Sequence, residues 1–204
     1  MSYLDTLSAV QKQNAQILQQ QMVAKGINNP YTQAAILAVI SKESSFIPQN
    51  ENLKYTATRI TQVWPKISAT VAAGLANNPQ KLGDYVYGPI MNKSLGNAVG
   101  EGYKYRGRGY NQITGKANYQ KIGSQIGVDL VNNPDLLNDP KVAADAAILF
   151  FTNGITSMSK LGKLSQYNAT NINDFKNEID SVGAIYHVNA GIGSTKAKLD
   201  ADTT

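Results

Sequence analysis

Residues 29–46 read NPYTQAAILAVISKESSF, and this stretch predicts the helix on which the fold is built. Asn29-Pro30 is a typical start, because the asparagine side chain can accept a backbone hydrogen bond and proline already has a helical φ. The run that follows is apolar nearly all round, which is typical of a buried helix. We therefore expect a central buried helix over residues 30–44, which a polar stretch and Pro48 bring to an end.

Further helices are predicted on both sides of this one. Apolar residues recur at helical spacing from Leu4 to Met22, and Gly26 is a C-terminal stop signal. Trp64-Pro65 separates two short helices, because the residue before a proline avoids the α conformation. The additional helices are expected over residues 4–24, 56–63, 65–73, 79–86, 115–126, 140–152 and 174–187.

Residues 88–111 interrupt this pattern. They are rich in Gly, Asn and Tyr and show no helical period, so we expect a long irregular loop or a small β-hairpin. Long irregular segments in compact domains are often functional, and we expect this one to form one wall of a cleft. The predicted fold class is mainly α with one glycine-rich loop, and the tail after Gly193 is expected to fray.

Composition narrows the possible chemistry. The 204 residues include no cysteine and one histidine, His187, and the formal net charge is +5. Disulfides, thiolate metal sites and a cysteine nucleophile are excluded, and one histidine cannot build a histidine-rich zinc site. We therefore expect chemistry based on carboxylates without a metal or organic cofactor, and a structural role for His187. The positive charge favours a polyanionic partner, such as nucleic acid, an anionic membrane or a bacterial cell wall.

Glu43 and Glu51 are the candidate pair of carboxylates. Hydrolysis of a glycosidic bond needs a proton donor on one side and a base that activates water on the other. Glu43 ends the apolar helix, where burial and the helix dipole would favour its protonated form. Glu51 lies in a polar stretch, where water would keep it ionised. Two glutamates at this spacing are common by chance, which leaves open that both are surface residues at a helix end.

Longer segments strengthen this interpretation. Residues 102–119, GYKYRGRGYNQITGKANY, match the pattern Y-R-G-R-G-x-x-Q-[LI]-[TS]-x-x-x-N-Y of glycoside hydrolase family 19. That family includes plant-type chitinases and many bacteriophage endolysins, and the chain resembles it over about residues 34–152. Supporting segments are ESSF at 43–46, ENLKY at 51–55, WP at 64–65, NPQKLG at 78–83, VY at 86–87 and NPDLL at 133–137.

The resemblance implies a lysozyme-like helical fold and an inverting mechanism. In this mechanism Glu43 protonates the leaving oxygen, Glu51 activates a water molecule and Thr114 helps to hold that water. Substrate contacts are implied for Gln112, Asn118 and Asn189, and for Tyr55 and Tyr119, with core packing as the alternative for both tyrosines. The implied organisation is a helical extension over residues 1–28, packed on a single domain whose catalytic part is 29–204.

The chain departs from the family pattern near both glutamates. Lys42 stands where plant-type members often have histidine, and we expect its side chain to point to another face than Glu43. The turn after Glu43 carries Ser44-Ser45 where a glycine pair is usual, and it is one residue shorter than in some relatives. Glu101 is the alternative to Glu51 as base. Arg106 and Arg108 are expected to brace the glycine-rich loop through buried hydrogen bonds.

The function expected from these observations is hydrolysis of bacterial peptidoglycan glycan strands, as a muramidase or glucosaminidase of endolysin type. A chitinase of the same family is the first alternative, and an inactive wall-binding or virion structural protein is the second. A basic nucleic-acid binder is the third alternative, but no nucleic-acid partner is expected. No apolar stretch approaches the ~20 residues that span a bilayer, and no signal peptide is recognised. We expect a monomer made in the host cytoplasm and released to the wall at lysis, or carried in the virion.

Overall fold

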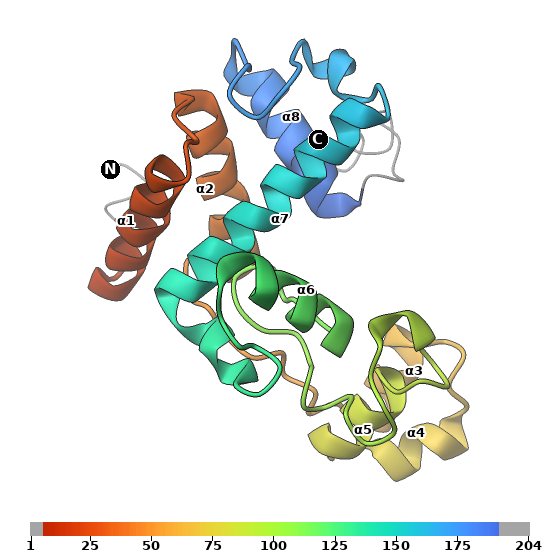
Figure 1. The fold of residues 1–204 in the computed structure, drawn as a ribbon. Helices are drawn as coiled ribbons and strands as arrows, with labels where there is room; N and C mark the ends of the chain where they lie inside the picture. The colour runs from red at the N-terminus through yellow and green to blue at the C-terminus, as the bar shows by residue number, and fades with distance from the viewer. Residues whose placement is uncertain (1–5, 192–204) are drawn as a thin grey trace. The chain divides into compact units, whose positions relative to one another are not determined.

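The computed structural model describes residues 6–191, and within this range the protein is helical (Figure 1). The described range contains no β-strand, and only one antiparallel bridge forms, between Arg108 and Ile113. The α-helices are α1 (Ala9–Ala24), α2 (Pro30–Ser44), α3 (Ala57–Val63), α4 (Ala69–Leu75), α5 (Pro79–Val86), α6 (Lys116–Ile126), α7 (Pro140–Lys160) and α8 (Glu178–Ala190). Three 3-10 turns accompany them: η2 (Lys93–Leu95), η3 (Pro134–Asn138) and η4 (Leu164–Tyr167). The predicted mainly α, lysozyme-like class is confirmed.

The described chain divides into two compact units. Unit 1 takes in the described residues up to Pro48 and from Asp139, and unit 2 is the continuous stretch Gln49–Asn138. Unit 1 therefore holds α1, α2, α7, η4 and α8, and unit 2 holds α3 to α6 with η2 and η3.

Helix α7 is the most deeply buried element of unit 1. It buries nine residues, among them Phe151 and Ile155, whereas α2 buries six and exposes Ala34 and Ala38. The prediction that α2 is buried on all sides is therefore wrong, because small alanines can face solvent at little cost. Helix α2 packs against α8, and α1 packs against α7. Gly154 allows close packing of α7 on α8, because a Cβ there would lie 2.2 Å from Val188 Cγ1.

Helix starts follow local capping signals. The side chains of Asn29, Asn78 and Asp139 each accept a backbone hydrogen bond from the first turn of the helix that follows. The helices beginning at Pro30, Pro79 and Pro140 thus start where the sequence predicts. Other limits differ: α4 begins at residue 69 rather than 65, α7 continues to 160 rather than 152, and α8 begins at 178 rather than 174.

The predicted first helix begins at Ala9, with Ser8 as its N-cap. Its expected first residues, 4 and 5, and the tail after Gly193 lie outside the described residues. No helix within residues 6–191 combines the length and the apolar character that crossing a membrane requires.

Unit 2 has its own hydrophobic core, around which α3, α4 and α5 lie together (Figure 1). The buried members are Leu53, Ile60, Ile67, Ala72, Leu82 and Val86. Tyr55 and Trp64 pack against this core, with ring centroids 5.9 Å apart. The glycine-rich loop lies directly on α5, because a Cβ on Gly102 would lie 2.2 Å from the carbonyl oxygen of Gly83. The core thereby holds one end of the loop in place.

Candidate active site

Glu43 lies in the last turn of α2 and is exposed. The buried face of this helix passes through Ile40 and Ser44, which places Glu43 on the solvent side. The expectation that Glu43 is buried against the apolar helix is therefore wrong. Its carboxylate instead accepts a hydrogen bond from Asn189 on α8, whose Nδ2 lies 3.0 Å from Oε1. The two predicted site residues of unit 1 thus come together.

The turn after Glu43 has an unusual backbone. Ser45 and Phe46 have φ values of 49° and 59°, in the left-handed region. This conformation costs about 1–2 kcal/mol for each residue that carries a Cβ. Lys42, on the preceding helix turn, places its ammonium group over the ring of Tyr186, 5.1 Å from the centroid. The surrounding structure must therefore hold this turn in place.

Glu51 is half-buried at the start of unit 2, and its carboxylate accepts several hydrogen bonds. The Tyr87 hydroxyl donates to both oxygens, 2.7 Å from Oε1 and 2.8 Å from Oε2. The backbone N–H of Gly107 also donates to Oε2, at 3.3 Å. In return, the backbone N–H of Glu51 donates to the Gly107 carbonyl, at 2.8 Å. Tyr87 and Gly107 thus hold the carboxylate while its remaining lone pairs can still accept a water molecule.

Tyr87 is a site residue that the sequence did not reveal. Burial and the hydrogen bond to Glu51 raise the pKa of its hydroxyl far above the ordinary value of tyrosine. Tyr87 therefore remains a hydrogen-bond donor at any pH at which an enzyme would work. Val86-Tyr87 belongs to a segment that resembles the family, but Glu51 and Tyr87 are 36 residues apart and no spacing rule relates them.

Gly107 lies where the loop approaches Glu51 closely. A Cβ at this position would lie 2.8 Å from Gln112 Oε1 and 3.3 Å from Glu51 Cβ. The first distance is shorter than real Cβ contacts, so a larger residue would displace a neighbouring side chain. The small residue therefore permits the backbone hydrogen bonds to Glu51.

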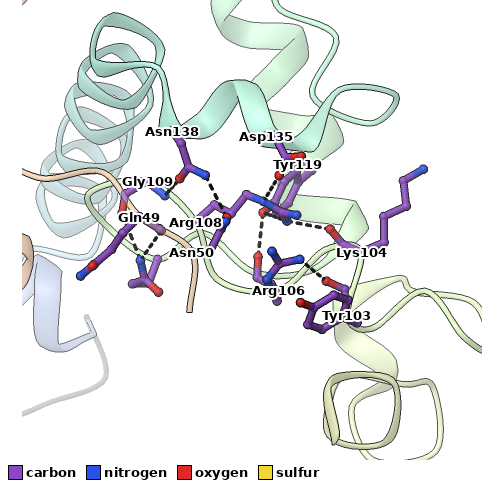
Figure 2. Close-up of polar contacts among 11 residues, drawn as sticks. Gln49, Asn50, Tyr103, Lys104, Arg106, Arg108, Gly109, Tyr119, Asp135 and Asn138 are labelled. Atoms are coloured by element: carbon purple, nitrogen blue, oxygen red, sulfur yellow. Dashed lines mark hydrogen bonds and ion pairs between the residues drawn. The ribbon is translucent and has the colours of Figure 1, made fainter. Parts of the chain in front are cut away.

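Arg108 braces the loop from inside unit 2, as Figure 2 shows. Its side chain is 3% exposed. Nε bonds to Asp135 at 2.9 Å, and Nη1 donates to the Lys104 carbonyl at 2.7 Å and to the Tyr119 hydroxyl at 2.9 Å. Arg106 Nη1 donates to the carbonyl of Tyr103 at 3.0 Å. The prediction that both arginines brace the loop is confirmed.

Tyr119 belongs to the same brace rather than to a substrate surface. It is completely buried, and its hydroxyl donates to the Arg106 carbonyl at 2.7 Å. Its ring packs edge-on against Tyr105, with centroids 5.4 Å apart. Burial raises the pKa of Tyr119 to about 12, although the nearby Arg108 opposes this shift. The core-packing alternative therefore describes Tyr119, whereas Tyr55 is only half-buried.

Gln112, Thr114 and Asn118 follow one another along the edge of the loop and the start of α6. Gln112 has a φ of 50°, and its Nε2 donates to the carbonyls of Gln49 and Gly109, at 3.0 and 3.1 Å. The Thr114 hydroxyl donates to the Gln112 carbonyl at 2.9 Å, and Asn118 Nδ2 donates to the Thr114 carbonyl at 2.7 Å. These side chains are held in place locally, and Gln112 lies beside Gly107 and therefore near Glu51.

Glu101, the alternative base, has a different environment. Both of its carboxylate oxygens bond to the Lys116 ammonium group, at 2.9 and 3.1 Å, and one accepts the backbone N–H of Ala98. Together these bonds lower the pKa of Glu101. The carboxylate of Glu101 thus ties the loop to α6. Within residues 6–191, no group of three or more His, Asp and Glu side chains could hold a metal ion.

His187 has the structural environment that the sequence predicts. It is 1% exposed on α8, and its Nδ1 lies 2.9 Å from the Tyr167 hydroxyl. The pair joins η4 to α8 within unit 1. Neither residue belongs to the group around Glu43.

Comparison with known proteins identifies the family of the chain. The family model described as class I chitinase, glycoside hydrolase family 19, matches residues 28–191. A glycosyl hydrolase family 19 domain-containing protein of Haemophilus influenzae is 34% identical over 121 residues, which cover 56% of this chain and 58% of the relative. Endochitinase 1 of Theobroma cacao is 32% identical over 134 residues, which cover 59% of this chain and 40% of the relative.

Shorter matches reach higher identity. Chitinase 11 of Oryza sativa subsp. japonica is 56% identical over 48 residues, 23% of this chain and 19% of that protein. The chain thus spans 58% or less of the length of these three relatives. The family match, in contrast, extends from before α2 to the end of α8 and includes every candidate site residue. The chain belongs to glycoside hydrolase family 19.

Proposed function

We propose that the protein hydrolyses the β-1,4 bond between N-acetylated amino sugars, with peptidoglycan glycan strands as its substrate. The observation that carries this proposal is the environment of Glu51. A hydroxyl and a backbone N–H hold its carboxylate without neutralising it, because within residues 6–191 no cationic side chain is among its hydrogen-bond donors. A general base needs this combination of negative charge and defined direction.

Glu43 has the complementary role of general acid. It is exposed, so a substrate oxygen can reach it, and Asn189 orients its carboxyl group. Protonation of the leaving oxygen by Glu43 and attack by a water molecule activated by Glu51 amount to a single displacement with inversion. Thr114 would help to hold the water, while Gln112, Asn118 and Tyr55 would contact the sugars.

Two substrates share this chemistry. Peptidoglycan is favoured by the formal net charge of +5, because bacterial walls are anionic. This substrate fits an endolysin that is made in the host cytoplasm and reaches the wall at lysis. Chitin is the second candidate, and it is favoured by the endochitinases among the relatives. The two candidates differ in the polymer and not in the roles of the glutamates.

The test compares the wild-type protein with Glu43→Gln and Glu51→Gln on purified sacculi and on colloidal chitin. Each amide has the shape of the glutamate but neither its charge nor its acidity, so we expect kcat to fall by about 10²–10⁴-fold. Glu101→Gln is the matched control, and we expect it to retain most of the activity. Mass spectrometry of fragments identifies the new reducing ends, and NMR of freshly released sugars identifies the anomer.

The outcomes separate the alternatives. Release from sacculi with the inverted anomer supports the proposal, and release from chitin alone supports a chitinase. Wild-type activity of Glu43→Gln would show that the acid is assigned wrongly. Wall binding without release of fragments would identify a non-catalytic wall-binding protein.

A further inference from the structure

Helix α1 contacts the turn that follows Glu43. Gln11 Nε2 donates to the carbonyl of Ser45, at 3.1 Å, and Asn14 Nδ2 donates to the carbonyl of Phe46, at 2.8 Å. Ser45 and Phe46 are the two successive residues with positive φ. The hydrogen bonds from α1 thus end on the least favourable backbone of this turn.

The side chains of α1 that make these bonds are themselves held in place. Gln11 Oε1 accepts the backbone N–H of Ser8 in the capping box of α1, so the amide is held from both ends. Asn14 is 5% exposed, although its side chain is polar. A buried amide costs stability unless it is hydrogen-bonded, and the Phe46 carbonyl supplies a partner.

The rest of α1 anchors it to unit 1. Leu18 and Met22 continue the face of Asn14 at intervals of four residues, and both are completely buried. Near the C-terminal end of α1, the Lys25 ammonium group lies 3.1 Å from Asp145 on α7. The helix is therefore attached along its length to α7, and it presents Gln11 and Asn14 to the turn.

We propose that α1 positions the general acid by holding the turn after Glu43 in its left-handed conformation. The proposal rests on the function proposed above. It gives a role to a segment that precedes the family match, which begins at residue 28. Ser45 and Phe46 carry side chains that do not favour positive φ, and the two hydrogen bonds from α1 stabilise their backbone. Gln11 and Asn14 are positioning residues, because they act on Glu43 only through the turn.

Asn14→Leu tests the proposal, because leucine has a similar size and a higher helix propensity but no N–H donor. We expect kcat, measured on the polymer that the wild-type protein hydrolyses, to fall on the order of tenfold. Small displacements of a catalytic group lower the rate by at least that much. KM should stay within about twofold, because Asn14 does not contact the sugars. Gln13→Leu is the matched control, because Gln13 is exposed on the same helix.

A second substitution separates positioning from simple stability. Ser45→Gly supplies a residue that adopts positive φ without strain, so kcat of the double variant Asn14→Leu/Ser45→Gly should return to within about threefold of the single variant Ser45→Gly. Glu43→Gln is measured alongside.

If Glu43→Gln is inactive and Asn14→Leu has wild-type kcat, α1 has no positioning role. If Asn14→Leu lowers the unfolding midpoint and kcat together and Ser45→Gly restores neither, the role of α1 is structural and the proposal is overturned. Activity in Glu43→Gln would instead refute the proposed general acid.

Discussion

Substitution of Tyr87 by phenylalanine removes one hydroxyl group from the environment of the proposed base. The variant Tyr87→Phe keeps the ring that packs against the core of unit 2, so its fold should be preserved. Glu51 then retains one of its two donors, the Gly107 N–H at the longer distance of 3.3 Å. The change therefore isolates the hydrogen bonds of 2.7 and 2.8 Å between Tyr87 and the carboxylate.

The magnitude follows from the type of bond that is lost. A hydrogen bond to a charged group contributes about 1.5–3 kcal/mol, and 1.36 kcal/mol corresponds to a factor of about ten in rate. If half of this energy serves to orient the carboxylate, kcat should fall about three- to tenfold.

The assay is kcat for wild type, Tyr87→Phe and Tyr85→Phe, measured on whichever polymer the wild-type protein hydrolyses. Tyr85 is the matched control, because it lies in the last turn of α5, two residues before Tyr87, is 39% exposed and makes no hydrogen bond through its hydroxyl within residues 6–191. A Tyr87→Phe variant with the wild-type kcat would refute the reasoning, provided that Glu51→Gln is inactive.

Three other substitutions test the loop that carries this site. Gly107→Ala places a Cβ 2.8 Å from Gln112 Oε1, so we expect about 1–3 kcal/mol of destabilisation and a lower kcat. Arg108→Lys keeps the charge but loses the fork of donors, which should lower the free energy of unfolding by about 3 kcal/mol and the unfolding midpoint in calorimetry by about 6–12 °C. In the wild-type protein the unfolding free energy should fall as pH rises from about 10 to about 12, because Tyr119 ionises near 10.0 when unfolded but at about 12 when folded. Tyr119→Phe should flatten this decline in urea titrations, and at neutral pH it should cost about 1–2 kcal/mol for the lost hydrogen bonds.

Each of these expectations can fail in its own way. A Gly107→Ala variant with normal kcat would show that the neighbouring side chains can move aside. An unfolding midpoint of Arg108→Lys equal to that of the exposed control Arg59→Lys would show that the hydrogen bonds of Arg108 do not stabilise the fold. An unchanged alkaline decline in Tyr119→Phe would assign that decline to other groups, such as Tyr87.

The starts of the helices could be predicted because their signals are local. Asn29, Asn78 and Asp139 each cap the helix that follows with a side chain two or three residues away from its partner. The ends of helices are harder to predict. Helix α7 continues to Lys160 because it packs on α8 and α1, and no local pattern encodes this packing. Its Gly154 would suggest a stop in isolation, but it is required by the close approach of Val188.

In the candidate site, too, features with local signals could be predicted and features that depend on distant contacts could not. Glu43, Glu51, Gln112, Thr114 and Asn118 could be named from short motifs, because each lies in a segment with a recognisable order of residues. Other features depend on contacts between distant parts of the chain. Tyr87 contacts Glu51 across 36 residues, and Asn14 contacts the turn after Glu43 across 32. The exposure of Glu43 was also missed, because helical periodicity near a helix end does not reveal which flank a neighbouring helix covers.

The order of units along the chain has a consequence for synthesis on the ribosome. Unit 2 is a continuous stretch of residues 49–138, and its two ends meet where Asn138 Nδ2 donates to Asn50 Oδ1 at 2.9 Å (Figure 2). Translation proceeds at about 5–20 residues per second, so roughly 5–20 s separate the emergence of α2 from that of α7. During this interval the apolar face of α2 lacks α8, its eventual partner, whereas unit 2 can already mature. We therefore expect chaperones to bind and protect the first two helices of the nascent chain. Resistance to protease should develop in unit 2 before it develops in the segments on either side of it.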